Sequence, residues 1–151
     1  MTFSQKQIYI AMQKYCDYQE RCHKDVHTKL REFQLYEDEK NEIINELITN
    51  NYLNEERFAK AYAGGKFRQN DWGKTKITNE LKFKQVSPYN IKKGLEEIDD
   101  EAYEKKLIHL LEKKQNTLPK GLKDYQKKYK LTQFLLQKGY EYELIQRYMG
   151  I

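Results

Sequence analysis

The residues with the clearest chemical potential are the basic side chains in the middle of the chain. Between Arg57 and Lys84 the sequence holds eight Lys or Arg and only two acids. Such a cluster predicts an acidic partner, because cationic side chains that bind a polyanion release its condensed counterions. The residues predicted to form the partner-binding face are Lys66, Arg68, Lys74, Lys76, Lys82 and Lys84.

A second basic stretch covers residues 105–130, where only Glu112 and Asp124 carry negative charge. For any single lysine, a solvated surface position is the alternative to a partner contact. The nine lysines predicted to form this second patch are Lys105, Lys106, Lys113, Lys114, Lys120, Lys123, Lys127, Lys128 and Lys130.

Helical geometry limits how the first cluster can be used. On a helix beginning at Lys74, with about 100° per residue, the apolar Ile77 and Leu81 share one side and the lysines fall around them. One helix therefore cannot present all of its lysines along one line. We expect the binding face to be assembled with Lys66 and Arg68 from the preceding helix.

Signals for catalysis or metal binding are weak. Cys16, Cys22, His23 and His27 lie close together, but their spacing matches no common zinc pattern. Gly73-Lys74-Thr75 is similar to the end of a phosphate-binding loop, yet the glycine required five residues earlier is absent and no strand precedes it. We therefore predict no catalytic residue, no metal site and no cofactor.

Composition predicts a thin core under a charged surface. Charged residues make up 34% and hydrophobic residues 38% of the 151 residues, and the mean hydropathy is -1.02. The net charge of +5 again favours an acidic partner. The N-terminus lacks the apolar stretch of a signal peptide, and no run approaches the roughly 18 apolar residues that cross a bilayer. We expect a cytoplasmic monomer with reduced cysteines and no membrane contact.

Internal repetition predicts the architecture. A shift of 51 residues places Val26 on Ile77 and Leu30 on Leu81, and a further shift of 54 carries Ile77 to Leu131. Apolar residues that recur in this way indicate a tandem repeat, and the scarcity of proline favours helices over strands. We predict an all-α fold of three tandem three-helix repeats in an elongated, curved array of about nine short helices.

The predicted repeats cover residues 1–50, 51–100 and 101–151, and the second carries the motif described below. The predicted helices are 5–18, 23–34, 37–50, 54–70, 73–85, 88–98, 101–115, 122–138 and 141–149.

Three features leave alternatives open. Arg57 is interpreted as a structural ion pair that locks one repeat to the next, with a functional contact as the alternative. Trp72 is either a cap over the core or an anchor that stacks on a base or a protein surface. Gly64 and Gly65 indicate a kink or a close helix crossing, or else a hinge.

The second repeat contains the segment Tyr52-Leu53-Asn54-Glu55-Glu56-Arg57-Phe58-Ala59, followed by Gly73-Lys74-Thr75-Lys76-Ile77. These segments resemble the G-Y-L-[DN]-[DE]-x-R-[FY]-A and G-P-x-[RK]-I elements of the RecX family, bacterial regulators of the RecA recombinase. Asn51 and Lys74 stand where the family has glycine and proline. The likeness extends over roughly residues 6 to 149 as repeats and about 52 to 98 as motif.

The resemblance implies a protein that is not an enzyme and that takes part in DNA recombination and repair. It would bind the RecA–DNA filament and limit filament growth, ATP hydrolysis and strand exchange. The rival hypothesis is a general nucleic-acid-binding helical module that acts directly on DNA. Binding to bare single-stranded DNA, compared with recombinase-coated DNA across a salt series, distinguishes the two.

Overall fold

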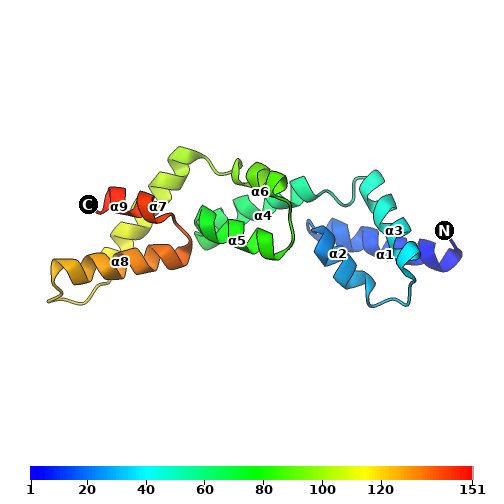
Figure 1. Ribbon diagram of the computed structural model, residues 1–151, viewed down its shortest axis with the longest axis horizontal. Coiled ribbons are helices and arrows are strands. Elements are labelled where there is room, and N and C mark those ends of the chain that lie inside the picture. The colour runs from blue at the N-terminus through cyan, green and yellow to red at the C-terminus, as the bar shows by residue number, and fades with distance from the viewer. Residues whose placement is uncertain (151) are drawn as a thin grey trace.

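The computed structural model describes residues 1–150, which form nine helices and no strand. In Figure 1 the helices follow one another along an elongated molecule whose termini lie at opposite ends. The predicted all-α class is therefore confirmed. No helix within these residues is both long and apolar enough to span a bilayer. The helices are α1 (Phe3–Tyr18), α2 (His23–Leu30), α3 (Glu37–Thr49), α4 (Glu55–Asn70), α5 (Lys74–Phe83), α6 (Pro88–Leu95), α7 (Asp100–Gln115), α8 (Asp124–Lys138) and α9 (Tyr142–Tyr148).

Local capping explains where several helices begin and end. The side chains of Asn54 and Ser87 accept hydrogen bonds from backbone amides three residues further on, as N-caps do. Gly139 ends α8 in the left-handed conformation, with φ of 99°. The second helix, α2, ends earlier than predicted because the chain continues as a tighter turn, in which the Phe33 amide donates to the Leu30 carbonyl.

The repeated apolar positions occupy matching places along the chain. The middle helix of each set of three buries two aliphatic side chains one turn apart, and the i, i+4 spacing puts both on one face. The sets α1–α3, α4–α6 and α7–α9 are called the first, second and third unit below. The buried pairs in α2, α5 and α8 are Val26 and Leu30, Ile77 and Leu81, and Leu131 and Leu135.

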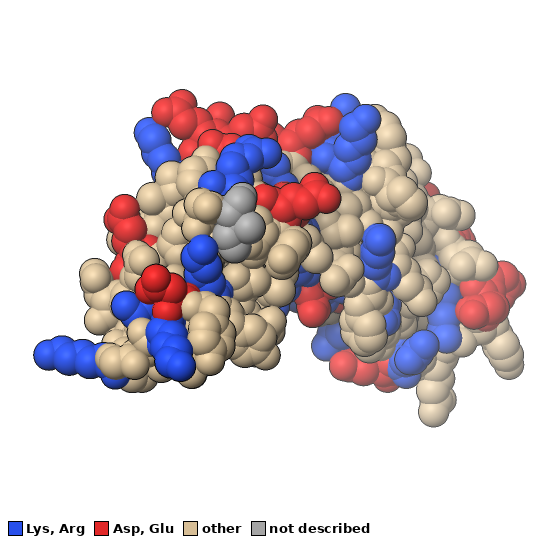
Figure 2. All heavy atoms as spheres, turned by 60° about the vertical axis from the view of Figure 1, so that its left-hand side comes forward, with Lys and Arg blue, Asp and Glu red and all other residues tan. Residues whose placement is uncertain are grey.

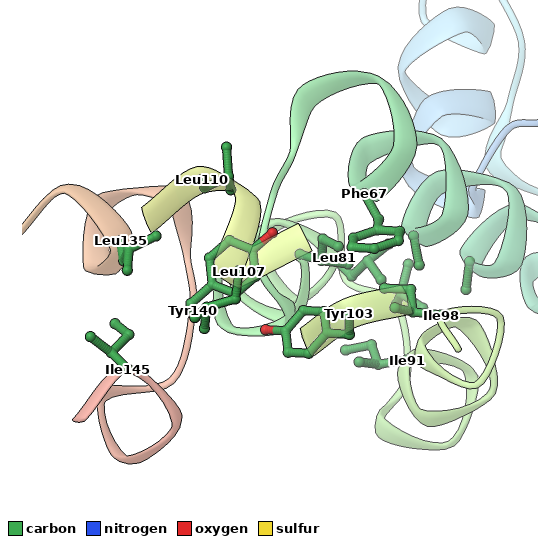
Figure 3. Close-up of a cluster of buried hydrophobic side chains, with 14 of the residues drawn as sticks. Phe67, Leu81, Ile91, Ile98, Tyr103, Leu107, Leu110, Leu135, Tyr140 and Ile145 are labelled. Carbon is green, nitrogen blue, oxygen red and sulfur yellow. The ribbon is translucent and has the colours of Figure 1, made fainter. Parts of the chain in front are cut away.

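Two hydrophobic clusters stabilise these units. The smaller cluster belongs to the first unit, where Met12, Ile43 and Leu47 are fully buried. The larger cluster continues from the second unit into the third, and Figure 3 shows Tyr103 and Tyr140 within it. Their rings stack with centroids 5.0 Å apart. The second and third units therefore share one core.

Backbone hydrogen bonds hold the start of α5 against the end of α8. The amide of Gly73 donates to the Lys138 carbonyl at 2.7 Å, and the amide of Thr75 donates to the Gly139 carbonyl at 2.9 Å. A Cβ added to Gly73 would lie 2.3 Å from the Gly139 carbonyl oxygen. This approach is possible only because neither residue has a side chain.

Two buried tyrosines complete this junction. Tyr103 Oη accepts from the Lys74 amide at 2.8 Å and donates to the Glu141 carboxylate. Tyr140 donates to the Asp71 carbonyl at 3.1 Å. Burial raises the pKa of both hydroxyl groups, so they stay protonated donors at neutral pH. The free amides at the start of α5 are thus occupied by groups of the third unit.

Arg57 joins the second unit to the first. Its Nε donates to Glu20 Oε1 at 2.7 Å, and its Nη2 donates to the carbonyls of Asn51-Tyr52 at 3.0 and 3.3 Å. Glu55, on the same helix, accepts from the His23 amide at 2.9 Å. These contacts agree with the interpretation of Arg57 as a lock between repeats.

We expect Arg57→Ala to lower the free energy of unfolding by about 1–2 kcal/mol, because one charge-assisted bond and two bonds to carbonyls are lost. Urea unfolding followed by circular dichroism measures the loss. Lys60→Ala is the matched control, since within residues 1–150 Lys60 pairs only with Glu56 on its own helix at 3.8 Å. The control should change stability by less than about 0.5 kcal/mol, and equal losses in both variants would contradict the lock.

Cys16 and Cys22 are buried free thiols. Burial raises the pKa of both to about 11 from an ordinary 9.0. We expect the folded protein to react with a disulfide reagent at pH 8 at least about 100-fold more slowly than the unfolded chain, because the thiolate is the nucleophile. Burial of the two thiols favours their neutral form and therefore makes the stability of the fold depend on pH. Since the folded-state pKa is raised, the stabilisation is fully present below pH 9 and is lost as the pH rises towards 11. Labelling of the folded protein at pH 8 as fast as that of the unfolded chain would contradict the burial of the two thiols.

The glycine pair in α4 does not interrupt the helix. The atoms nearest to a Cβ added at Gly64 belong to the Arg68 guanidinium, and one added at Gly65 meets nothing within 4 Å. The close crossing is at Gly94 of α6, where an added Cβ would lie 2.6 Å from the Ala59 carbonyl oxygen. The close packing expected at Gly64 and Gly65 therefore occurs at a different glycine, because α4 and α6 meet there backbone to backbone.

Candidate partner-binding surface

Two aromatic side chains, Tyr62 of α4 and Trp72 just beyond its end, form the centre of the candidate surface. Both are partly buried against the larger cluster, and their rings meet edge to face with centroids 6.4 Å apart. Burial, aided by the Glu80 charge, raises the pKa of Tyr62, which stays neutral. Trp72 thus covers the core while part of it faces solvent. This pair is called the Tyr62–Trp72 shelf.

Three of the six predicted basic residues surround this shelf. Lys66 Nζ lies 5.0 Å and Lys76 Nζ 4.6 Å from the ring centroid of Trp72. Lys84 Nζ lies 5.8 Å from that of Tyr62. Ammonium groups are attracted to ring faces at such distances. Within residues 1–150 none of the three lysines has a carboxylate oxygen within 4.0 Å, so their charges are available to a partner.

A groove of about 350 Å³ lies beside the shelf, between the first and second units. Arg21 of the first unit lines it together with Lys66 and Lys84. Of the two acids in the lining, Glu20 is paired with Arg57, and the other caps the start of α2. The groove therefore adds a cation that sequence reasoning missed. No local signal links position 21 to position 66, because only the packing of the units brings them together.

The other predicted residues lie elsewhere. Lys74 and Lys82 are on the opposite flank of the buried stripe of α5, as about 100° per residue requires. Both line a separate pocket of about 680 Å³ that also contains Asp99 and Asp100, and Lys74 Nζ lies 3.4 Å from Asp100. Arg68 is exposed near the end of α4. The six residues are thus divided between different faces.

The nine lysines of the second stretch are divided as well. Lys105 pairs with Glu101 at 3.0 Å and Lys106 with Asp71 at 2.8 Å, so both make structural contacts. The other seven have no carboxylate oxygen within 4.0 Å in the part of the chain that the structure describes. Figure 2, with the third unit turned forward, shows acidic and basic side chains mixed over this face, with a dense acidic group at the upper edge.

The chemistry that this arrangement supports is binding. Ammonium groups can hold phosphate or carboxylate groups, and the aromatic rings beside them can stack on a flat surface. His109, the isolated histidine of α7, is exposed. No group of three or more His, Cys, Asp or Glu side chains within the nine helices and their described connections is arranged to hold a metal ion.

Comparison with family models finds two matches. A model described as the second three-helix domain of RecX matches residues 54–95, and one described as the third three-helix domain of RecX matches residues 101–149. Curated relatives named "Regulatory protein RecX" are similar over most of the chain. The protein from Streptococcus uberis is 30% identical over 138 residues, which cover 90% of this chain and 52% of the relative. The one from Clostridium perfringens is 36% identical over 121 residues, which cover 80% and 56%.

Solved structures show the same relationship. The crystal structure of RecX from Lactobacillus salivarius has a TM-score of 0.86 and 30% identity, with 95% of this chain and 92% of that chain covered. A second structure, of a regulatory protein RecX, has a TM-score of 0.83 at 21% identity and shows the likeness of the fold alone. This chain spans about half the length of the curated relatives it matches.

Proposed function

This chain belongs to the RecX family, and from that premise we propose that it binds the RecA–DNA filament and restrains filament growth, ATP hydrolysis and strand exchange. The observation that carries the proposal is the Tyr62–Trp72 shelf with its three available lysines. Acidic side chains of a protein filament and the phosphates of its DNA both complement such a surface. The protein acts by occupying this filament and carries out no reaction itself.

The shape of the molecule supports a filament as the partner. The shelf is in the second unit and the available lysines of the second patch are in the third, so two contacts at separate positions can reinforce each other. We propose residues 1–50, 51–100 and 101–151 as the three repeats. The protein is proposed to act as a cytoplasmic monomer.

ATP hydrolysis by RecA on single-stranded DNA tests the function. The protein should lower the rate of ATP hydrolysis at concentrations that are too low for it to bind bare DNA. The reason is that the filament offers acidic protein side chains as well as DNA phosphates. Filament growth, followed by fluorescence of labelled DNA, should slow in parallel. An unchanged hydrolysis rate at saturating protein would contradict the proposal. Steeply salt-dependent binding to bare DNA, with no preference for the coated form, would favour the rival nucleic-acid-binding module.

A further inference from the structure

Two tyrosines of α8 are exposed at the surface of the third unit. The side chains of Tyr125 and Tyr129 are each 66% exposed. Their i, i+4 spacing separates them by only about 40° around the helix. Together with Leu122 and Lys130 they line an apolar pocket of about 380 Å³. Exposed rings that line one pocket differ from scattered surface tyrosines, because they offer a continuous face for a flat apolar group.

Basic residues are concentrated in the part of the chain that forms this pocket. Residues 113–130 contain seven lysines and a single acid, Asp124. In residues 1–150 none of these lysines has a carboxylate oxygen within 4.0 Å, and Lys114 lies over the ring of Phe134, with Nζ 5.0 Å from its centroid. Lys130 lines the pocket itself, and Lys114 lines a second pocket that shares Tyr129 and Lys130 with it. The seven lysines are Lys113, Lys114, Lys120, Lys123, Lys127, Lys128 and Lys130.

We propose that Tyr125, Tyr129 and the surrounding lysines form a site for single-stranded nucleic acid, separate from the Tyr62–Trp72 shelf. The tyrosine rings stack on unpaired bases, whose faces a duplex conceals, while the lysines follow the phosphates. A second copy of this chain is a poor occupant, because it would place seven lysines against seven lysines. The site goes beyond the filament contact and does not require RecA.

The direct test uses the full chain and a fluorescent oligothymidine of about 20 nucleotides, long enough to cover one site. Tyr125→Ala/Tyr129→Ala should weaken binding at least about 10-fold, as loss of base stacking predicts. Tyr125→Phe/Tyr129→Phe should bind like the parent chain, because the ring is kept. The matched control is Tyr18→Ala/Tyr36→Ala, which removes two tyrosines that are 84% and 80% exposed in the first unit. Equal affinities of the two alanine double variants would overturn the site.

Salt dependence provides a second readout. Lys128→Gln/Lys130→Gln should reduce the slope of log K against log salt concentration by about 1.4, because each phosphate contact contributes about 0.7 on a single strand and Lys130 lines the pocket itself. Circular dichroism confirms that each variant is folded. An unchanged slope would overturn the role of the lysines.

Competitors decide which polyanion the face prefers. Tighter binding to duplex DNA of the same length, or to vesicles of anionic phospholipid, would overturn the assignment to single strands. The filament proposal is judged separately by inhibition of RecA. A protein that inhibits RecA but does not bind the oligonucleotide refutes this site alone, and one that binds it without inhibiting refutes the filament proposal alone.

Discussion

Gly139→Ala is expected to lower the free energy of unfolding by roughly 3 kcal/mol or more, through backbone strain and overpacking together. Gly139 has φ of 99°, where a residue with a side chain is strained by about 1–2 kcal/mol. Its added Cβ would also lie 2.3 Å from Lys76 Cβ and 2.8 Å from the Lys76 amide nitrogen. Neither atom is the free end of a flexible side chain, so α5 itself has to move. Urea unfolding measures the loss.

Two other glycines separate strain from overpacking. Gly121 also has positive φ, 85°, but a Cβ there would meet nothing within 4 Å, so Gly121→Ala should cost only about 1 kcal/mol. Gly65→Ala, inside α4 with open space around it, should raise stability by up to about 1 kcal/mol. A loss for Gly139→Ala no larger than for Gly121→Ala would show that the junction between the second and third units can widen.

The combined variant Lys66→Glu/Lys76→Glu/Lys84→Glu is expected to raise the protein concentration needed for half-inhibition of RecA by at least about 30-fold, or about 2 kcal/mol. The three ammonium groups lie around one aromatic pair, so their reversal turns an attractive surface into a repulsive one. The three side chains are not tied into ion pairs in the described residues, so the fold should survive. ATP hydrolysis by RecA on single-stranded DNA is the assay.

A control with the same change in net charge is available in the first unit. Lys6, Lys14 and Arg31 are exposed, and reversing all three should shift the half-inhibitory concentration less than about 3-fold, since screening removes distant charges. Lys82→Glu tests the other flank of α5. Inhibition that falls equally in the control and in the shelf variant would mean that net charge, rather than the shelf, governs the contact.

The helices and their repeat could be predicted from the sequence because those signals are local. Val26, Ile77 and Leu131 recur at matching positions, and each lies buried in the middle helix of its unit. Caps such as Asn54 involve residues three positions apart, so they too can be predicted without a fold. The lysine-rich stretches could also be recognised from composition. Lysines that are close together in the sequence nevertheless lie on different surfaces of the folded protein.

The partners of particular side chains could not be predicted in the same way. Arg57 finds its carboxylate on Glu20, 37 positions away, although Glu55 and Glu56 are its neighbours in the chain. Arg21 joins Lys66 and Lys84 only because the first unit lies against the second. Such pairs depend on how helices are rotated and packed, and no spacing rule within one helix contains that information.

By itself, the sequence determined that this protein is a tandem array of short helices with surplus lysine, because helix periodicity, capping and charge all act between residues a few positions apart. Only the tertiary structure decided that three of the six predicted cations share the Tyr62–Trp72 shelf and that Lys74 and Lys82 do not. The physical reason is the orientation of α5, which is held by contacts such as the hydrogen bond from the Thr75 amide to the Gly139 carbonyl, 64 positions apart in the chain.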